Sequence, residues 1–235
     1  MIVSCIWEHN NNDTLLYASD LPGAFSRGET LAVALQKMGP EVRSYLKWVG
    51  CTEPEHIDIH ITQEAPSDLA IADADSDVLF QTEQLPLTMD EYLQLKALTL
   101  KSARDFLALY YAIPDKHRSS SPARKTFYGK VPATAEEMYQ HTKNVNAYYV
   151  GEIDVEANNE GSILSCREQG FDILEQQTDF LQNKVWEGSY GESWSLRKLL
   201  RRFLWHDRIH AKAMYRMAMR EFAANTVPNL FFFEV

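Results

Sequence analysis

Hydrophobic positions repeat at the helical period over the last long stretch of the chain, from Trp194 to Phe222. Apolar residues recur there three and four positions apart, and no Gly or Pro interrupts them before Pro228. Ser195 is a suitable N-cap, because its side-chain oxygen can accept a hydrogen bond from an amide of the first turn. The pattern predicts one long helix, whose many Lys and Arg side chains are expected to form a solvated face.

Three earlier stretches carry the same period and predict three more helices, at about 88–113, 134–151 and 161–184. The first two open with a Thr-x-x-Glu capping-box pattern, which is typical of a helix N-terminus. Residues 114–132 combine prolines, serines and basic residues, and we expect a surface connection longer than most. Four helices with one long crossover predict a helix bundle.

The first 85 residues alternate polar and apolar positions instead, around a single helical stretch at 30–48. Gly39-Pro40 is expected to kink or split that helix. The strands predicted from the alternation and from β-rich composition are residues 2–7, 14–19, 56–62 and 78–82. The change of period predicts an α+β fold class, with a small domain at residues 1–85 and a bundle with a C-terminal tail at residues 86–235.

Composition and charge argue against nucleic-acid and membrane partners and against disulfide bonds. The 235 residues carry a net charge of −10, so the clustered Lys and Arg that phosphate backbones require are mostly missing, and nucleic acid is not expected as a partner. No run of 18 apolar residues occurs, and residues 1–10 lack the basic flank of a signal peptide, so we expect no membrane partner and a cytoplasmic location. Cys5, Cys51 and Cys166 form no Cys-x-x-Cys pair and are predicted to be reduced thiols.

Histidine spacing supplies the candidate chemistry. His206 and His210 lie one turn apart on the last helix, so their imidazoles project about 40° apart and can reach one metal ion. On the helix at 134–151, His141 shares a face with Glu137 and Tyr148 and becomes the candidate third ligand. Three neutral imidazoles leave a coordination position open, as in catalytic zinc sites. Zinc and nickel both suit imidazole, and the sequence does not separate them.

Two motifs of the C-terminal part resemble the DinB superfamily. They are T-A-E-E-M-x-x-H on one helix and W-S-x-R-K-x-L-R-R-x-x-W-H-x-x-x-H on the last, and the resemblance covers about residues 86–225. In that family a four-helix bundle holds a divalent metal on three histidines, which match His141, His206 and His210 here. The resemblance implies a thiol-dependent S-transferase or related activity, with a small thiol and a small electrophile as partners. Sulfoxide-synthase relatives carry H-x-x-x-H-x-E, and Lys212 in place of that Glu disfavours their chemistry.

Residues 17–48 resemble the HicB-like fold, in which a strand leads through D-L-P-G and a short turn into G-x-T-x-x-x-A-L on a helix. Domains of this kind are antitoxins and small interaction modules. No catalytic residue carries over to this chain. The resemblance implies that the N-terminal domain contacts a protein partner, so a non-catalytic metal-containing binding module stands as the alternative to an enzyme.

Four other residues near the histidines are candidates for a role in the site. Arg202 lies one turn before His206 on the same face and can grip a substrate carboxylate or form a salt bridge with Glu137. Glu137 and Tyr148 are the candidate bases. His117 lies in the long connection and is expected to be exposed.

Two further stretches lie outside the candidate metal site, a polar row on one strand and the apolar C-terminal tail. The row His56, Asp58 and His60 on one strand face can in principle bind metal, but it is expected to be the polar solvent side of a sheet. The tail, residues 230–235, is expected to dock against the N-terminal sheet or against a second subunit, which would make a homodimer.

Overall fold

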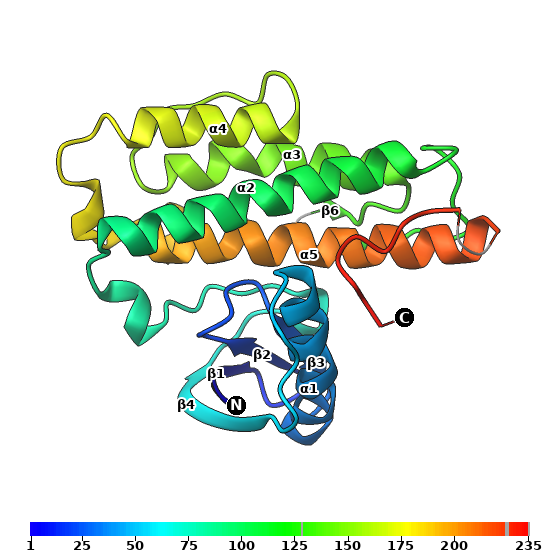
Figure 1. Ribbon diagram of the computed structural model, residues 1–235, viewed down its shortest axis with the longest axis horizontal. Coiled ribbons are helices and arrows are strands. Elements are labelled where there is room, and N and C mark those ends of the chain that lie inside the picture. Colours follow the sequence, from blue (N-terminus) through cyan, green and yellow to red (C-terminus); the bar gives the residue numbers. More distant parts are fainter. Residues whose placement is uncertain (128, 224–225, 235) are drawn as a thin grey trace.

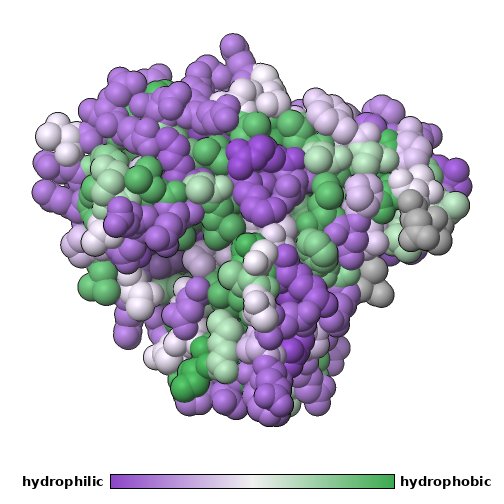
Figure 2. Space-filling view, in the orientation of Figure 1, coloured by the Kyte–Doolittle hydropathy of each residue, from purple (hydrophilic) through white to green (hydrophobic). Residues whose placement is uncertain are grey.

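A computed structural model describes residues 1–127, 129–223 and 226–234 of the chain (Figure 1). Within those residues the fold is mixed α+β, with five α-helices and one small mixed sheet of four strands. The fold class predicted from the change of hydrophobic period is therefore confirmed at this level. No described helix is long and apolar enough to cross a membrane. Figure 2 shows hydrophilic and hydrophobic residues intermixed over the viewed face.

The sheet has the strand order β3-β2-β1-β4. Its strands are β1 (Ile2–His9), β2 (Thr14–Ala18), β3 (Phe25–Gly28) and β4 (Asp58–Pro66). The predicted hairpin is confirmed, since β1 pairs with β2 antiparallel, and β4 returns parallel to β1 after helix α1 (Leu31–Trp48). A parallel return of this kind requires a crossover, which α1 supplies.

The strand predicted at residues 78–82 is wrong. Residues 81–84 form a short 3-10 helix, and the remaining place in the sheet belongs to β3, which the alternation did not reveal. Val78 and Phe80 are buried because they pack in one cluster with Tyr17 and Trp205. Their apolar character therefore reflects packing under the last helix and not strand pairing.

Strand β4 begins near the predicted place but is less buried than the isoleucine alternation suggested. It is an edge strand, and Ile61 is 38% exposed. The register breaks along β4, because Cys5 pairs with Ile61 while Ile6 pairs with Gln63. One extra residue in a strand shifts the following side chains to the opposite face, so a strict alternation in sequence does not keep one face inward.

Helix α1 is continuous from Leu31 to Trp48, with Pro40 inside it, so the predicted split does not occur. Thr30 caps its start by accepting a hydrogen bond from the Val33 amide. Pro40 is exposed, so the helical carbonyl that loses its partner there can be hydrated, while buried Met38 on the opposite side keeps the helix packed.

The C-terminal part consists of four helices: α2 (Met89–Ala112), α3 (Ala135–Gly151), α4 (Ile163–Leu174) and α5 (Leu196–Glu221). Both predicted capping boxes are present, as is the Ser195 N-cap of α5. Helix α4 is shorter than the predicted 161–184, because the chain turns after Leu174 and Phe180 packs edge-on against Tyr92, with ring centroids 4.9 Å apart.

Helix α5 is the central element of the molecule. Figure 1 shows α2, α3 and α4 on one side of it and α1 with the sheet on the other. Its basic residues are therefore not the solvated face that we predicted. Lys198, Arg201 and Arg208 are buried, and Arg201 and Arg208 pair with Glu83 and Glu41 of the N-terminal part, the latter at 2.6 Å. A buried charge is costly unless it is paired, and the second packing layer leaves basic residues of α5 exposed only toward its C-terminal end, at Arg216 and Arg220.

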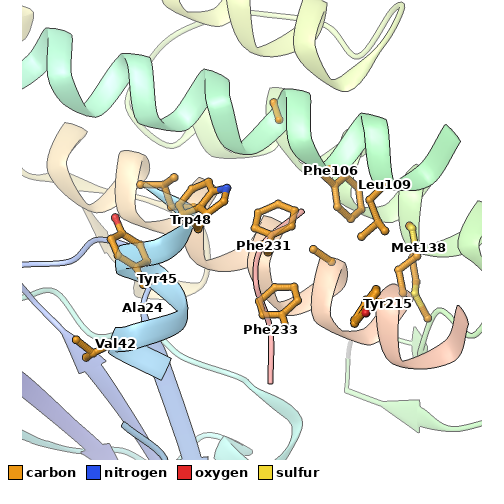
Figure 3. Close-up of a cluster of buried hydrophobic side chains, with 14 of the residues drawn as sticks. Ala24, Val42, Tyr45, Trp48, Phe106, Leu109, Met138, Tyr215, Phe231 and Phe233 are labelled. Carbon is orange, nitrogen blue, oxygen red and sulfur yellow. The ribbon is translucent and has the colours of Figure 1, made fainter. Parts of the chain in front are cut away.

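The C-terminal tail is part of the core. Figure 3 shows Phe231 and Phe233 between the side chains of α1 and those of α2 and α5. Phe231 stacks on Trp48 with ring centroids 5.3 Å apart, and Ser44 Oγ donates a hydrogen bond to its carbonyl oxygen at 3.2 Å. The tail thus docks on the helix of the N-terminal part and not on its sheet, while Val235 lies outside the described residues. Residues from both sides of position 85 share this core cluster, and the domain boundary there stays a prediction.

Candidate metal centre

Helices α3 and α5 bring the three predicted histidines together. One ring nitrogen from each of His141, His206 and His210 lies within 4.8 Å of the other two, so the group could hold a metal ion. Nε2 of His141 and Nε2 of His206 are 3.2 Å apart. Nitrogens bound at about 2.0–2.1 Å to one tetrahedral ion are separated by about 3.3 Å, so this spacing fits two ligands of the same ion.

The position of each histidine follows from local helix structure. Thr134 and Glu137 form the capping box that fixes the start of α3, and His141 follows one turn after Glu137. On α5 the neighbouring residue Asp207 projects about 100° away from His206 and into the bundle. Arg167 of α4 holds it there through two hydrogen bonds of 2.6 and 3.1 Å. This pair fixes the rotation of α5, and with it the direction of both of its histidines.

The three imidazoles are neutral at physiological pH. Burial lowers the pKa of His210 to about 3, and the neighbouring His141 lowers it further in the same direction. Burial also lowers the pKa of His206 well below its usual value, and partial burial lowers that of His141. Neutral imidazole is the form that binds a metal ion, so the site is ready to bind without displacing a proton.

The three histidines differ in their exposure to solvent. His206 is 8% exposed, His210 is intermediate, and His141 is exposed. The site therefore lies at the edge of the bundle core and opens to solvent on the side of His141. An accessible side is what an ion with an exchangeable ligand requires.

His206 has a further feature that packing alone does not explain. Its Nδ1 is buried and has no hydrogen-bond partner among the described residues. The ring lies edge to face against that of Tyr149, with centroids 5.9 Å apart. A buried polar atom without a partner is uncommon and is expected where a side chain does more than fill space.

Glu137 lies one turn before His141, but its carboxylate is committed elsewhere. It forms an ion pair with Lys130 at 2.5 Å and accepts hydrogen bonds from the amides of Ala133 and Thr134. These contacts lower the pKa of Glu137 to about 2, first through Lys130. A carboxylate with such a pKa is a weak proton acceptor near neutral pH.

Arg202 pairs with no carboxylate within the described part of the chain, so the salt bridge with Glu137, one of the two roles that the sequence left open, is absent there. One guanidinium nitrogen donates to the carbonyl oxygen of Ser76 at 2.7 Å, and the group stacks over Trp205 with 4.7 Å to the ring centroid. Its charge lies near His206, where it disfavours protonation of the ring. Arg202 thus contributes positive potential to the site from behind the triad.

Tyr148, the other candidate base, lies two turns beyond His141 on α3. Its ring is edge-on to Trp194, with centroids 6.3 Å apart, and the side chain is partly exposed. Burial and the neighbouring Glu152 raise the pKa of its hydroxyl. A hydroxyl with a raised pKa stays protonated at neutral pH, so Tyr148 is a hydrogen-bond donor and not a base.

Three ion pairs hold the long connection, one each to α5, to the N-terminal part and to α3. Arg118 pairs with Glu221 at 3.2 Å, Arg124 with Asp73 at 2.9 Å, and Lys130 with Glu137 at 2.5 Å. Its last anchor is one turn from His141. His117 is exposed, as predicted, and so is the row His56, Asp58 and His60.

The sequence did not reveal Arg167 as part of the site's support. Its guanidinium is fully buried among the bundle helices, bonding Asn146 of α3 at 3.0 Å in addition to Asp207. The available signal was a charged residue between the apolar positions of α4. A lone Arg at such a position is more often exposed, and its partners are distant in sequence, so only the folded structure shows them.

Comparisons of the chain with protein-family models, with curated proteins and with solved structures gave no match.

Proposed function

We propose that this protein holds one divalent metal ion on His141, His206 and His210 and uses it to activate a small thiol, as a thiol-dependent S-transferase acting on a small electrophile. The observation that carries the proposal is the convergence of three neutral imidazole nitrogens within 4.8 Å at the open edge of a helix bundle. The proposal treats residues 86–235 as a DinB-like bundle and residues 1–85 as a HicB-like module. Zinc and nickel are the ions that we propose for the site.

The residues around the triad favour an anionic ligand. All three ligating side chains are neutral, and the nearest charges acting on His206 are the guanidinium groups of Arg202 and Arg167. When bound, the ion would lower the pKa of a coordinating thiol, so that the thiolate persists at neutral pH. The ligands would not offset the positive charge of the ion, and Arg202, unlike Arg167, has no carboxylate partner among the described residues, so a thiolate would compete well with water for the open position.

The reaction needs few groups of the protein. The thiol proton would leave to solvent on binding, on the exposed side at His141. The sulfur would then form a bond to the electrophilic carbon, and the leaving group would depart with the bonding electron pair. This scheme requires no general base in the site, which agrees with the weak basicity of Glu137 and with the protonated hydroxyl of Tyr148.

One observation favours a second function. Glu137 is engaged in the capping box of α3 and in an ion pair with Lys130, and Arg202 is engaged with Ser76 and with the ring of Trp205. A site in which two of the candidate reactive groups are occupied structurally suits a non-catalytic, metal-containing binding module. In that case the HicB-like part would contact a protein partner.

Cobalt substitution separates the two functions. We expect that adding a low-molecular-weight thiol to the cobalt-loaded protein produces a sulfur-to-cobalt charge-transfer band, because the open position accepts a thiolate. The measurement is made in a Cys51→Ser background, since Cys51 is the exposed cysteine and could itself bind cobalt. The band should be lost in His210→Ala, and an alcohol of the same size should produce none. A cobalt-loaded protein that gives no band with any thiol would support the binding module instead.

A further inference from the structure

A groove of about 520 Å³ lies between β3, α1 and α5, next to the C-terminal tail. Figure 1 shows the tail descending beside α5 toward α1 at this place. On α5 the groove begins at Ile209 and Ala213, which flank His210, but the histidines do not line it. Its volume is in the range of small-molecule sites, about 300–1,000 Å³.

The wall of the groove is cationic, although the whole chain has a net charge of −10. Four basic side chains and two carboxylates line it: Arg27, Lys37, Lys212, Arg216, Glu41 and Glu234. A concentration of basic groups in an acidic protein draws anions to this one place.

Glu41 offsets only one of these basic groups. It is buried, and it accepts hydrogen bonds from Arg208 at 2.6 Å and from Lys212 at 3.3 Å. Arg208 is fully buried and lies outside the lining, so it takes up the charge of Glu41 from behind. Lys212 shares Glu41 with Arg208, so Arg27, Lys37 and Arg216 are the basic groups of the described lining that Glu41 does not pair.

Arg27 has hydrogen-bonding capacity to spare. Its Nε is buried and has no hydrogen-bond partner among the described residues. Lys37 donates to the carbonyl oxygen of Arg27 at 2.8 Å, which holds the lysine beside it. Burial lowers the pKa of Arg27, while the neighbouring Asp13 and Asp73 act in the opposite direction. Because Arg27 lines the groove, its guanidinium is placed to bind an oxyanion there through charge-assisted hydrogen bonds.

The other side of the groove is apolar. Phe25 and Pro40 line it together with Ile209 and Ala213. A ligand that fits both sides carries an oxyanion at one end and a hydrocarbon part at the other.

We infer that this groove binds a small organic oxyanion, with its carboxylate or phosphate group between Arg27 and Arg216 and its apolar part against Phe25 and Ile209. Binding requires no metal ion, so the inference stands whether or not the triad is catalytic. The groove and the triad share α5, and Ala213 lies only about 4.5 Å along the helix axis from His210.

Chemical-shift mapping of the full-length protein tests the inference, with inorganic phosphate and succinate as the probes at constant ionic strength. We expect amide shifts in β3 and in α5 around residues 209–216, saturating with at least one probe. Arg27→Gln and Arg216→Gln should each weaken that binding by about tenfold or more, because each removes a charge-assisted hydrogen bond. The matched control is Arg220→Gln, one turn further along α5, whose guanidinium bonds Ser121 outside the groove.

The probe that saturates identifies the oxyanion, carboxylate or phosphate. The His210→Ala variant should bind as the unmodified protein does, which separates this site from the metal centre. Shifts that do not saturate with either probe would overturn the inference, and so would an equal loss of affinity in all three arginine variants, since that indicates charge screening alone.

Discussion

Replacing His206 by Ala is expected to lower the affinity for zinc or nickel by more than about 100-fold, because outer-shell changes at metal sites already cost about 10–100-fold and this change removes a ligand. His206 is the most buried member of the triad, and its ring is within contact distance of both other rings. His141→Ala and His210→Ala should weaken binding in the same way. Metal content after dialysis against a mild chelator measures the effect.

His117→Ala is the matched control, since it removes an exposed imidazole from the same protein. It should retain full metal content. The triad would be the wrong site if all three single variants kept one ion per chain through the dialysis.

Replacing Arg167 by Met is expected to destabilise the protein by about 3–5 kcal/mol, because it leaves the carboxylate of Asp207 buried without its charge partner. Both side chains are fully buried, and the guanidinium also stacks over Phe203 with 4.1 Å to the ring centroid. The free energy of unfolding in urea measures the effect. The double variant Arg167→Met, Asp207→Leu should recover much of the loss, because no buried charge remains.

An exposed ion pair supplies the comparison for this prediction. Lys130 and Glu137 are 63% and 37% exposed, so Lys130→Met should change the free energy of unfolding by about 1 kcal/mol or less. If Arg167→Met cost no more than Lys130→Met, the pair would not be what fixes α5 in the bundle, and the support that we assign to the triad would be lost.

Local signals in the sequence predicted the helices well. The capping boxes at Thr88 and Thr134 and the N-cap at Ser195 depend on contacts within four residues, and all three are present. The one-turn spacing of His206 and His210 is likewise local, and it specifies a shared face wherever the helix lies. Bringing His141 to that face depended on a correct prediction of the bundle.

Long-range contacts explain what the sequence did not reveal. The basic residues of α5 resemble a solvent face until α1 is seen on that side, with Glu41 paired to Arg208. Strand β3 is only four residues long and is specified by its pairing with β2 more than by its composition. Arg167 and Asp207 are distant in sequence, and neither position alone indicates a buried pair.

A long-range contact also explains why the sequence suggested Glu137 as a base. Glu137 has the spacing of a residue that faces the triad, yet the capping box and Lys130 take both of its oxygens. A capping-box glutamate and a catalytic glutamate look alike in sequence when each lies one turn from a ligand. Only the position of Lys130, which the long connection supplies, distinguishes them.

X-ray absorption at the zinc edge of the zinc-reconstituted, full-length protein directly tests whether the three histidines bind the ion. We expect one zinc ion per chain whose inner shell contains nitrogen at about 2.0–2.1 Å, with multiple scattering from three imidazole rings and with the amplitude of one ring lost in His141→Ala. A shell made of sulfur or of carboxylate oxygen without imidazole, or a protein that takes up no zinc, would contradict it.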